Sequence, residues 1–165
     1  MAAQTSNGQL LRSTPAPRLS AQQWNLVALV GIILIVMAIL QLISFNSFKD
    51  WLGAIGLKSP ATWGVGVIIA ELFGAAGFFK LRLTYLVRLL SASLALLVGL
   101  FWFVESLQVV TSATAHNLTS SGFFGKYLHQ TPGWWTVIEA TVLLFWIVYA
   151  LELSKEDLML PKDRS

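Results

Sequence analysis

The sequence predicts an all-α integral membrane protein, a four-helix bundle with its N- and C-termini in the cytoplasm. Hydrophobic residues make up 56% of the 165-residue chain and charged residues 12%, whereas soluble domains average about 45–50% and about 25%. Four apolar runs are each close to the roughly 20 residues that cross a hydrocarbon core of about 30 Å. They span residues 25–45, 62–79, 89–110 and 134–153. Short connectors cannot cover four such helices, so we expect residues 24–153 to form the transmembrane domain.

The two ends of the chain are polar. Residues 1–23 are rich in Ser, Thr, Gln, Ala and Pro, and such a segment buries too little apolar surface to order itself. We expect a disordered cytoplasmic tail there and a second cytoplasmic tail at residues 154–165. The first apolar run is 21 residues long, which exceeds the roughly 7–15 residues of a signal-peptide core. We therefore expect it to remain as an anchoring helix.

The distribution of lysine and arginine predicts the orientation, because these residues are enriched in cytoplasmic loops. The two tails and the second connector carry eight of the eleven: Arg12, Arg18, Lys80, Arg82, Arg88, Lys155, Lys162 and Arg164. The first and third connectors carry Lys49, Lys58 and Lys126. We expect a multi-pass protein of the cell membrane, the inner membrane of a bacterium, with both termini facing the cytoplasm. We expect the basic residues of the second connector to reach the lipid head groups.

The first outer connector contains Phe48, Trp51, Leu52 and Ile55. Their i, i+3, i+4, i+7 spacing predicts a short amphipathic helix at the membrane interface. Small residues at fourfold spacing predict close helix contacts in the second and third runs. They are Gly66, Ala70 and Gly74, and then Ser91, Ala95 and Gly99.

Three glutamates interrupt the apolar runs: Glu71, Glu105 and Glu139. A charge at the centre of a membrane-spanning helix costs about 2.5–3.5 kcal/mol on insertion scales. Such residues should face the protein interior or water, and they are the candidate ligand- or proton-handling residues. We expect Glu71 near mid-membrane and the other two nearer the outer face, where Gln41 joins them from the first helix.

Further polar residues extend this group. Gln108 follows Glu105 at i+3 and should share its side of the helix. His116 and His129 lie in the outer loop above and are weaker candidates, because a histidine in a polar loop is most often a surface residue. We expect no metal site, because no HxxxH, HxH or ExxH spacing is present.

Several chemistries could use these groups. Buried carboxyl groups can hold and pass protons, and they can form hydrogen bonds with the carbonyl groups of a quinone in an apolar pocket. They can equally bond to Gln41, Gln108, Thr136 or the tryptophans and fix the bundle. The absence of cysteine excludes thiol exchange, and the dispersed basic residues do not indicate a nucleic-acid partner.

The segment 51–88 carries Trp51-Leu52, Gly56-Leu57, Pro60, Ala70-Glu71-Leu72, Gly74 and a basic turn with Arg82 or Arg88. This order resembles the DoxX-like family of small four-helix membrane proteins and its related MauE branch. The first and fourth runs depart from that family, since they lack the usual Gly-Leu-x-Lys ending and the Gly-Arg-Leu-Ser-Leu-Asp exit. The chain is therefore similar to a divergent member.

The resemblance implies a role in membrane redox systems, among them thiosulfate oxidation with quinone as acceptor, or in maturation of a disulfide-rich periplasmic enzyme. We expect a membrane subunit that binds a small apolar or redox-active ligand, with quinone as the candidate cofactor. It would act with a redox partner protein, with copies of itself and with the lipid bilayer, and it would not be an enzyme on its own. Two alternatives stay open: a proton-coupled small-solute carrier or channel component, and a non-catalytic assembly or scaffold protein.

Overall fold

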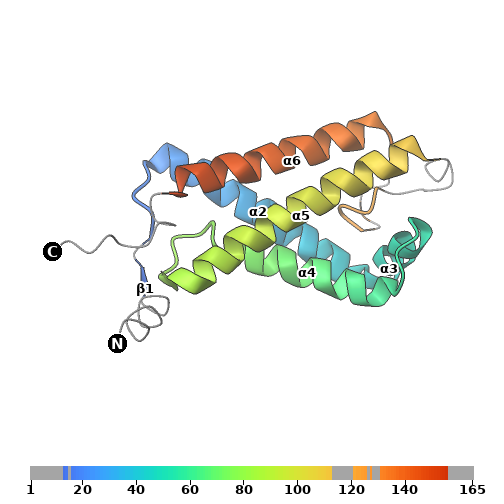
Figure 1. Ribbon diagram of the computed structural model, residues 1–165, viewed down its shortest axis with the longest axis horizontal. Helices are drawn as coiled ribbons and strands as arrows, with labels where there is room; N and C mark the ends of the chain where they lie inside the picture. Colours follow the sequence, from blue (N-terminus) through green and yellow to red (C-terminus); the bar gives the residue numbers. More distant parts are fainter. Residues whose placement is uncertain (1–12, 15, 113–120, 126, 128–130, 156–165) are drawn as a thin grey trace, which may run out of the picture.

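The computed structural model describes residues 13–14, 16–112, 121–125, 127 and 131–155 of the chain (Figure 1). Within these residues the fold is helical apart from one short pair of strands. The helices are α2 (Ala21–Ile43), α3 (Phe45–Ala54), α4 (Pro60–Ala76), α5 (Tyr85–Thr111) and α6 (Trp134–Leu153). The strands are β1 (Ser13–Thr14) and β2 (Leu83–Thr84), which pair antiparallel.

The four longer helices pack side by side along the long axis of the molecule (Figure 1). Helix α4 packs against both α2 and α5, α5 packs against α6, and a smaller contact between α2 and α6 completes the arrangement. Helix α3 packs mainly against α4 at one end. The start of α2 and the end of α6 lie together at the opposite end (Figure 1).

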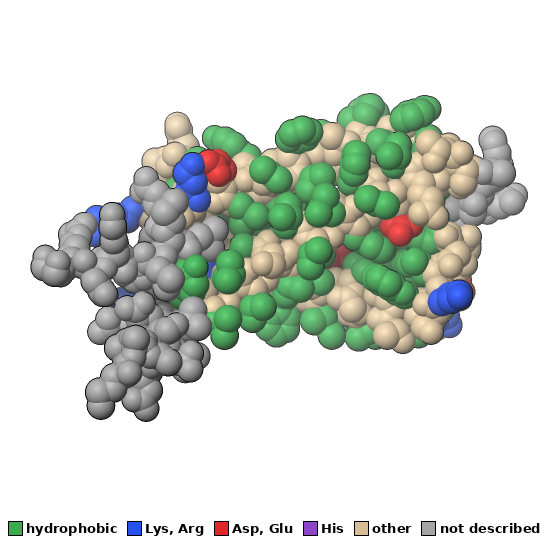
Figure 2. Space-filling view, viewed as in Figure 1, with side chains coloured by type: hydrophobic (Ala, Val, Ile, Leu, Met, Phe, Trp, Pro, Cys, Tyr) green, Lys and Arg blue, Asp and Glu red, His purple; other side chains and the backbone are tan. Residues whose placement is uncertain are grey.

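Three helices are long and apolar enough to cross a membrane: α2 with 23 residues, α5 with 27 and α6 with 20. This confirms the prediction of an all-helical chain with membrane-crossing segments. The second predicted span is shorter, because α4 has 17 residues and the chain turns after Ala76. Figure 2 shows hydrophobic side chains over the middle of the visible face, with the lysine and arginine side chains at its two ends.

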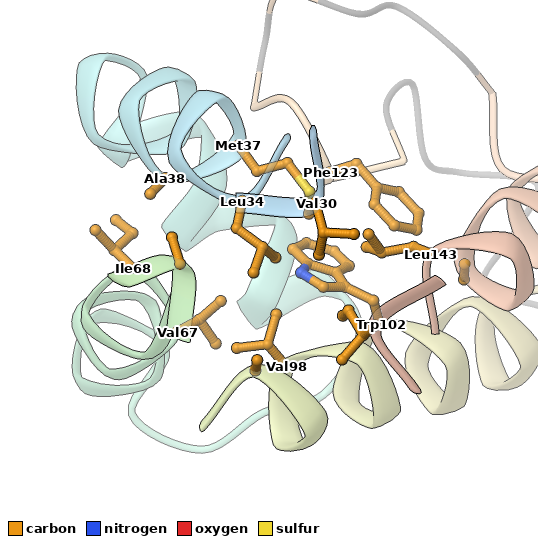
Figure 3. Close-up of a cluster of buried hydrophobic side chains, with 14 of the residues drawn as sticks. Val30, Leu34, Met37, Ala38, Val67, Ile68, Val98, Trp102, Phe123 and Leu143 are labelled. Carbon is orange, nitrogen blue, oxygen red and sulfur yellow. The ribbon is translucent and has the colours of Figure 1, made fainter. Parts of the chain in front are cut away.

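The core is formed by one side of each long helix (Figure 3). Side chains from α2, α4, α5 and α6 meet around Trp102, and Phe123 from the connector between α5 and α6 lies beside them. Trp102 and Leu34 are fully buried. Many other large apolar side chains of the same helices are exposed, which is the arrangement of helices that face lipid on their outer side.

Small residues allow α4 and α5 to approach closely, as their spacing predicts. A Cβ atom on Gly74 would lie 2.9 Å from the backbone nitrogen of Ala95. The hydroxyl of Ser91 donates to the Gly74 carbonyl (2.9 Å) and accepts from the Gly77 N–H (2.7 Å). The prediction is wrong for Gly66, which is exposed and has no neighbour within 4 Å of a Cβ position.

The amphipathic pattern of the first outer connector is confirmed as α3. Phe48, Trp51, Leu52 and Ile55 are all buried. Their apolar side is covered by protein, because α3 packs on the first half of α4. A Cβ atom on Gly64 would lie 3.0 Å from the ring of Phe45, so this glycine lets the two helices meet.

The end of the bundle near the start of α2 differs from expectation in two ways. Ser13 and Thr14 pair with β2, although a disordered tail is expected there. Arg88 is buried, with 4% of its surface exposed, so the expectation that it reaches the lipid head groups is wrong; its place in the first turns of α5 turns it toward the bundle. Lys80 lies over the ring of Trp24, 5.1 Å from the ring centre, which allows a cation–π contact.

Candidate functional site

Glu71 of α4 is fully buried at the centre of the polar contacts. Its Oε1 atom accepts two hydrogen bonds, one from Gln41 Nε2 of α2 (3.1 Å) and one from Trp102 Nε1 of α5 (2.9 Å). Three helices therefore meet at one carboxyl oxygen. Glu71 and Gln41 both face the interior, as expected for Glu71; their direct bond was not predicted, because Gln41 was expected nearer Glu105 and Glu139.

The hydrogen bond to Gln41 places Glu71 beside one end of α2. Its partner Gln41 lies two residues before Ile43, the last residue of α2. Glu71 is thus level with the end of α2 that is nearer α3. The first half of α4 packs on α3, where Gly64 meets Phe45 and Leu52, and the end of α4 meets α2 at Gly31.

Gln41 also connects this centre to the segment between α5 and α6. Its Nε2 atom donates a second hydrogen bond to the backbone carbonyl of Phe123 (3.0 Å). The ring of Phe123 stacks on Trp102, with centroids 4.5 Å apart and planes 20° apart. The buried glutamate, the amide and the loop are therefore held as one unit, which we call the Glu71 centre: Gln41, Glu71, Trp102 and Phe123.

Aromatic rings surround the Glu71 centre. The ring of Trp102 also lies 5.6 Å from that of Trp51, 6.2 Å from Phe48 and 5.3 Å from Phe101. Gly122 has a φ of 81° and fits against the Trp51 ring, where a Cβ atom would come within 2.6 Å. The carboxyl group is thus enclosed by rings from α3, α5 and the loop, and excluded from bulk solvent.

Several buried polar atoms near these rings have no hydrogen-bond partner among the described residues. They are Gln41 Oε1, Glu71 Oε2, Trp51 Nε1 and Ser121 Oγ. Unpaired buried polar atoms are rare in proteins and usually mark strain or function. The Glu71 centre therefore retains hydrogen-bonding capacity that the described part of the chain does not use.

Glu105 lies one turn after Trp102 on α5 and is 8% exposed. Its Oε2 atom is buried and has no partner within the described part of the chain. Gln108 is exposed, so the expectation that it shares a polar side with Glu105 is wrong. Three residues turn an α-helix by about 300°, and the remaining offset of about 60° carries Gln108 off the buried side.

Glu139 lies apart from the Glu71 centre and lines a pocket between α2, α6 and the loop that contains Phe123. The volume of this pocket is about 370 Å³. Its lining is Ile33, Met37, Phe123, Phe124, Trp135, Ile138, Glu139, Val142, Leu143 and Trp146. We call it the Glu139 pocket. Its wall is apolar and aromatic apart from the half-buried carboxyl group of Glu139.

Phe123 belongs to both places. Its ring lines the Glu139 pocket, while its carbonyl accepts the hydrogen bond from Gln41. Sequence reasoning missed Phe123 and Trp102, because neither residue stands in a recognisable motif. His116 and His129, the weaker candidates, lie outside the residues that the structure describes.

The helices and the buried carboxyl groups define a small helical protein with three segments of membrane-crossing length. Comparisons with models of protein families, with curated proteins and with solved structures find no match to this chain. The Glu71 centre and the Glu139 pocket are two places in the described chain where buried or half-buried carboxyl groups meet aromatic rings.

Proposed function

We propose that this chain is a DoxX-like subunit of a membrane redox system, and that it binds a quinone or a similar small apolar ligand in the Glu139 pocket. The observation that carries the proposal is the composition of that pocket. One carboxyl group stands among four aromatic side chains and aliphatic residues in a space of about 370 Å³. Ligand sites are typically apolar with few polar groups.

The pocket suits a planar ring with carbonyl substituents. Phe123, Phe124, Trp135 and Trp146 offer ring surfaces, and aromatic rings gain about 0.5–1.5 kcal/mol from stacked or edge contacts beyond the area they bury. The Glu139 carboxyl group can form a hydrogen bond with an oxygen substituent of the ring.

The shared residue Phe123 supports a link between the pocket and the Glu71 centre. A ligand that displaces the Phe123 ring also acts on its backbone carbonyl, which holds Gln41, and Gln41 in turn donates to Glu71. Ligand binding in the pocket would thus change the hydrogen bonds of the buried Glu71 carboxyl group, through Phe123 and Gln41.

We propose that the chain crosses a cell membrane with four helices, of which α4 is the shortest, and that both termini lie in the cytoplasm. The excess of lysine and arginine in the tails and the second connector supports this orientation. The shared position of the start of α2 and the end of α6 is consistent with it (Figure 1). A redox partner protein would supply or remove the electrons.

The proton-coupled carrier is less well supported. Within the described residues, the hydrogen-bond partners of Glu71 are Gln41 and Trp102, so Glu71 is not joined to Glu105 or Glu139 in a relay. A binding function needs only the pocket and its carboxyl group.

Titration with decylubiquinone in detergent tests the proposal. Trp135 and Trp146 line the pocket, so quinone binding should quench tryptophan fluorescence in a saturable way. Glu139→Leu should weaken binding by about two- to tenfold, the equivalent of one lost hydrogen bond. Ile138→Trp, which enlarges an exposed side chain of the lining, should block it.

Glu152→Leu is the matched control, because Glu152 is an exposed acid at the other end of α6 and does not line the pocket. Its quinone affinity should equal that of the parent. Quenching that never saturates, or that both pocket variants leave unchanged, would contradict the proposal.

A further inference from the structure

A larger hollow lies between α4 and α5, away from the Glu139 pocket. Its volume is about 620 Å³. Its lining is Lys58, Ser59, Thr62, Trp63, Gly66, Val67, Ala70, Leu94, Leu97, Val98 and Phe101. We call it the α4–α5 groove. It shares no lining residue with the Glu139 pocket, so it requires an explanation of its own.

The groove arises because α4 and α5 touch at one level and separate at another. At Gly74 a Cβ atom would lie 2.9 Å from the backbone of Ala95, whereas at Gly66 nothing lies within 4 Å of that position. Gly66 and Ala70 carry too little bulk to fill the space that opens toward the start of α4. The lining along Gly66, Val67 and Ala70 is apolar, and an apolar surface of this kind admits a flexible hydrocarbon chain.

The chemistry of the groove changes along its length. Lys58, Ser59 and Thr62 line it at the start of α4, and the remaining lining is apolar. The ring of Trp63 stacks on Phe101 there, with centroids 6.3 Å apart and planes 13° apart. Tryptophan is enriched at the level of lipid head groups, so this end has the properties of the membrane interface.

The charge at that end selects among lipids. Lys58 is exposed, and no acidic residue lines the groove. The first turn of α4 adds the positive end of its helix dipole beside Ser59. A zwitterionic head group would place its own cation against Lys58, whereas an anionic head group meets lysine, two hydroxyl groups and the helix terminus.

We propose that the α4–α5 groove binds one anionic phospholipid of the surrounding bilayer. An acyl chain lies along Gly66 and Ala70 between the two helices, and the phosphate group lies at Lys58. The bound lipid fills the space between α4 and α5 and gives the short helix α4 an anchor at the head-group level.

Native mass spectrometry of the full-length chain tests this inference. The protein is released from detergent after exposure to equal amounts of phosphatidylglycerol and phosphatidylcholine with identical acyl chains. The parent should retain one phosphatidylglycerol, with a preference of about fivefold, the ratio expected for one lysine near an anionic head group. Lys58→Gln should reduce the preference to about one.

Two further variants separate the head-group contact from the acyl-chain contact. Gly66→Leu fills the groove at a position with open space, so it should lower retention of both lipids. Lys49→Gln is the control, because Lys49 lies on α3 outside the groove lining, and it should keep the parental preference. Circular dichroism of each variant verifies that the helices are intact.

Three results would overturn the inference. Equal retention of the two lipids by the parent would indicate a non-selective boundary lipid. Lys49→Gln could lower the preference as much as Lys58→Gln, which assigns the effect to general surface charge. A dimer that Gly66→Leu abolishes would assign the groove to a second copy of the chain. None of these results affects the quinone titration, which depends on the other pocket.

Discussion

Glu71→Leu removes the acceptor on which α2, α4 and α5 converge while keeping a side chain of similar size. In the parent, Glu71 Oε1 accepts from Gln41 Nε2 at 3.1 Å and from Trp102 Nε1 at 2.9 Å. After the change, the Trp102 N–H has no acceptor among its described neighbours, whereas Gln41 keeps its bond to the carbonyl of Phe123. The variant therefore isolates the contribution of the buried carboxyl group to the bundle.

The magnitude follows from these contacts. A buried donor left without a partner costs about 1–3 kcal/mol, and a lost hydrogen bond whose donor keeps another partner costs about 0.5–1.5 kcal/mol. Replacing the buried carboxyl group by an apolar side chain also removes its desolvation cost, which offsets part of this loss. Hydrogen bonds between helices in membranes average only about 0.6 kcal/mol, with a maximum of about 1.7 kcal/mol. We expect Glu71→Leu to lower the free energy of unfolding by about 1–2 kcal/mol.

Glu71→Gln is the matched control, since it keeps a side-chain carbonyl oxygen that can accept both hydrogen bonds. Its free energy of unfolding should stay within about 1 kcal/mol of the parent. The measurement is equilibrium unfolding in mixed micelles of a mild detergent and sodium dodecyl sulfate, followed by circular dichroism and tryptophan fluorescence. A double-mutant cycle with Trp102→Phe should give a coupling of about 0.5–1.5 kcal/mol between positions 71 and 102.

Unfolding of Glu71→Leu at the same detergent ratio as the parent, or a double-mutant cycle without coupling, would contradict this prediction. Either result would mean that the two hydrogen bonds do not stabilise the bundle. If Glu71→Gln folds normally but abolishes the saturable quinone quenching, Glu71 has a functional role in addition to its structural one.

Two further predictions concern helix packing and orientation. Gly74→Ala should lower the free energy of unfolding by about 1–3 kcal/mol, because the added Cβ atom meets the α5 backbone. Gly66→Ala places its Cβ atom in open space, so it should be neutral or stabilise the protein by up to about 1 kcal/mol. Equal melting temperatures for the two variants would contradict this prediction. The chain has no cysteine, so a single Ala54→Cys should react with an impermeant thiol reagent in intact cells, and Arg82→Cys should react only after permeabilisation. The opposite labelling pattern would reverse the proposed orientation.

The positions of the helices could be predicted from the sequence because they depend on local composition. Long apolar runs must form helices to satisfy their backbone groups where water is absent. The predicted range 134–153 agrees with α6. The other three helices begin two to four residues earlier than predicted. Ser20 and Thr84, whose side chains cap α2 and α5, explain two of these starts, because capping residues extend a helix beyond its apolar run.

The cost of a carboxyl group in an apolar run also gave the correct burial of Glu71, whereas Gln41 was expected beside Glu105 and Glu139 and not beside Glu71. It could not give the bond between Glu71 and Gln41. That contact depends on the register of α4 against α2, which residues distant in sequence determine. Periodicity alone likewise placed Gln108 beside Glu105, whereas the buried side of α5 turns away from it.

The sequence by itself determined that the chain is helical, that long apolar helices run through it and that glutamates interrupt them, because each of these properties follows from residues close together in the chain. Only the tertiary structure decided that Trp102 and Phe123 complete the Glu71 centre and that Glu139 belongs to a separate pocket. It also decided that Gly66 opens a groove instead of closing a helix contact. These outcomes depend on how the helices cross and on a loop that folds back between them, and residues distant in sequence determine both.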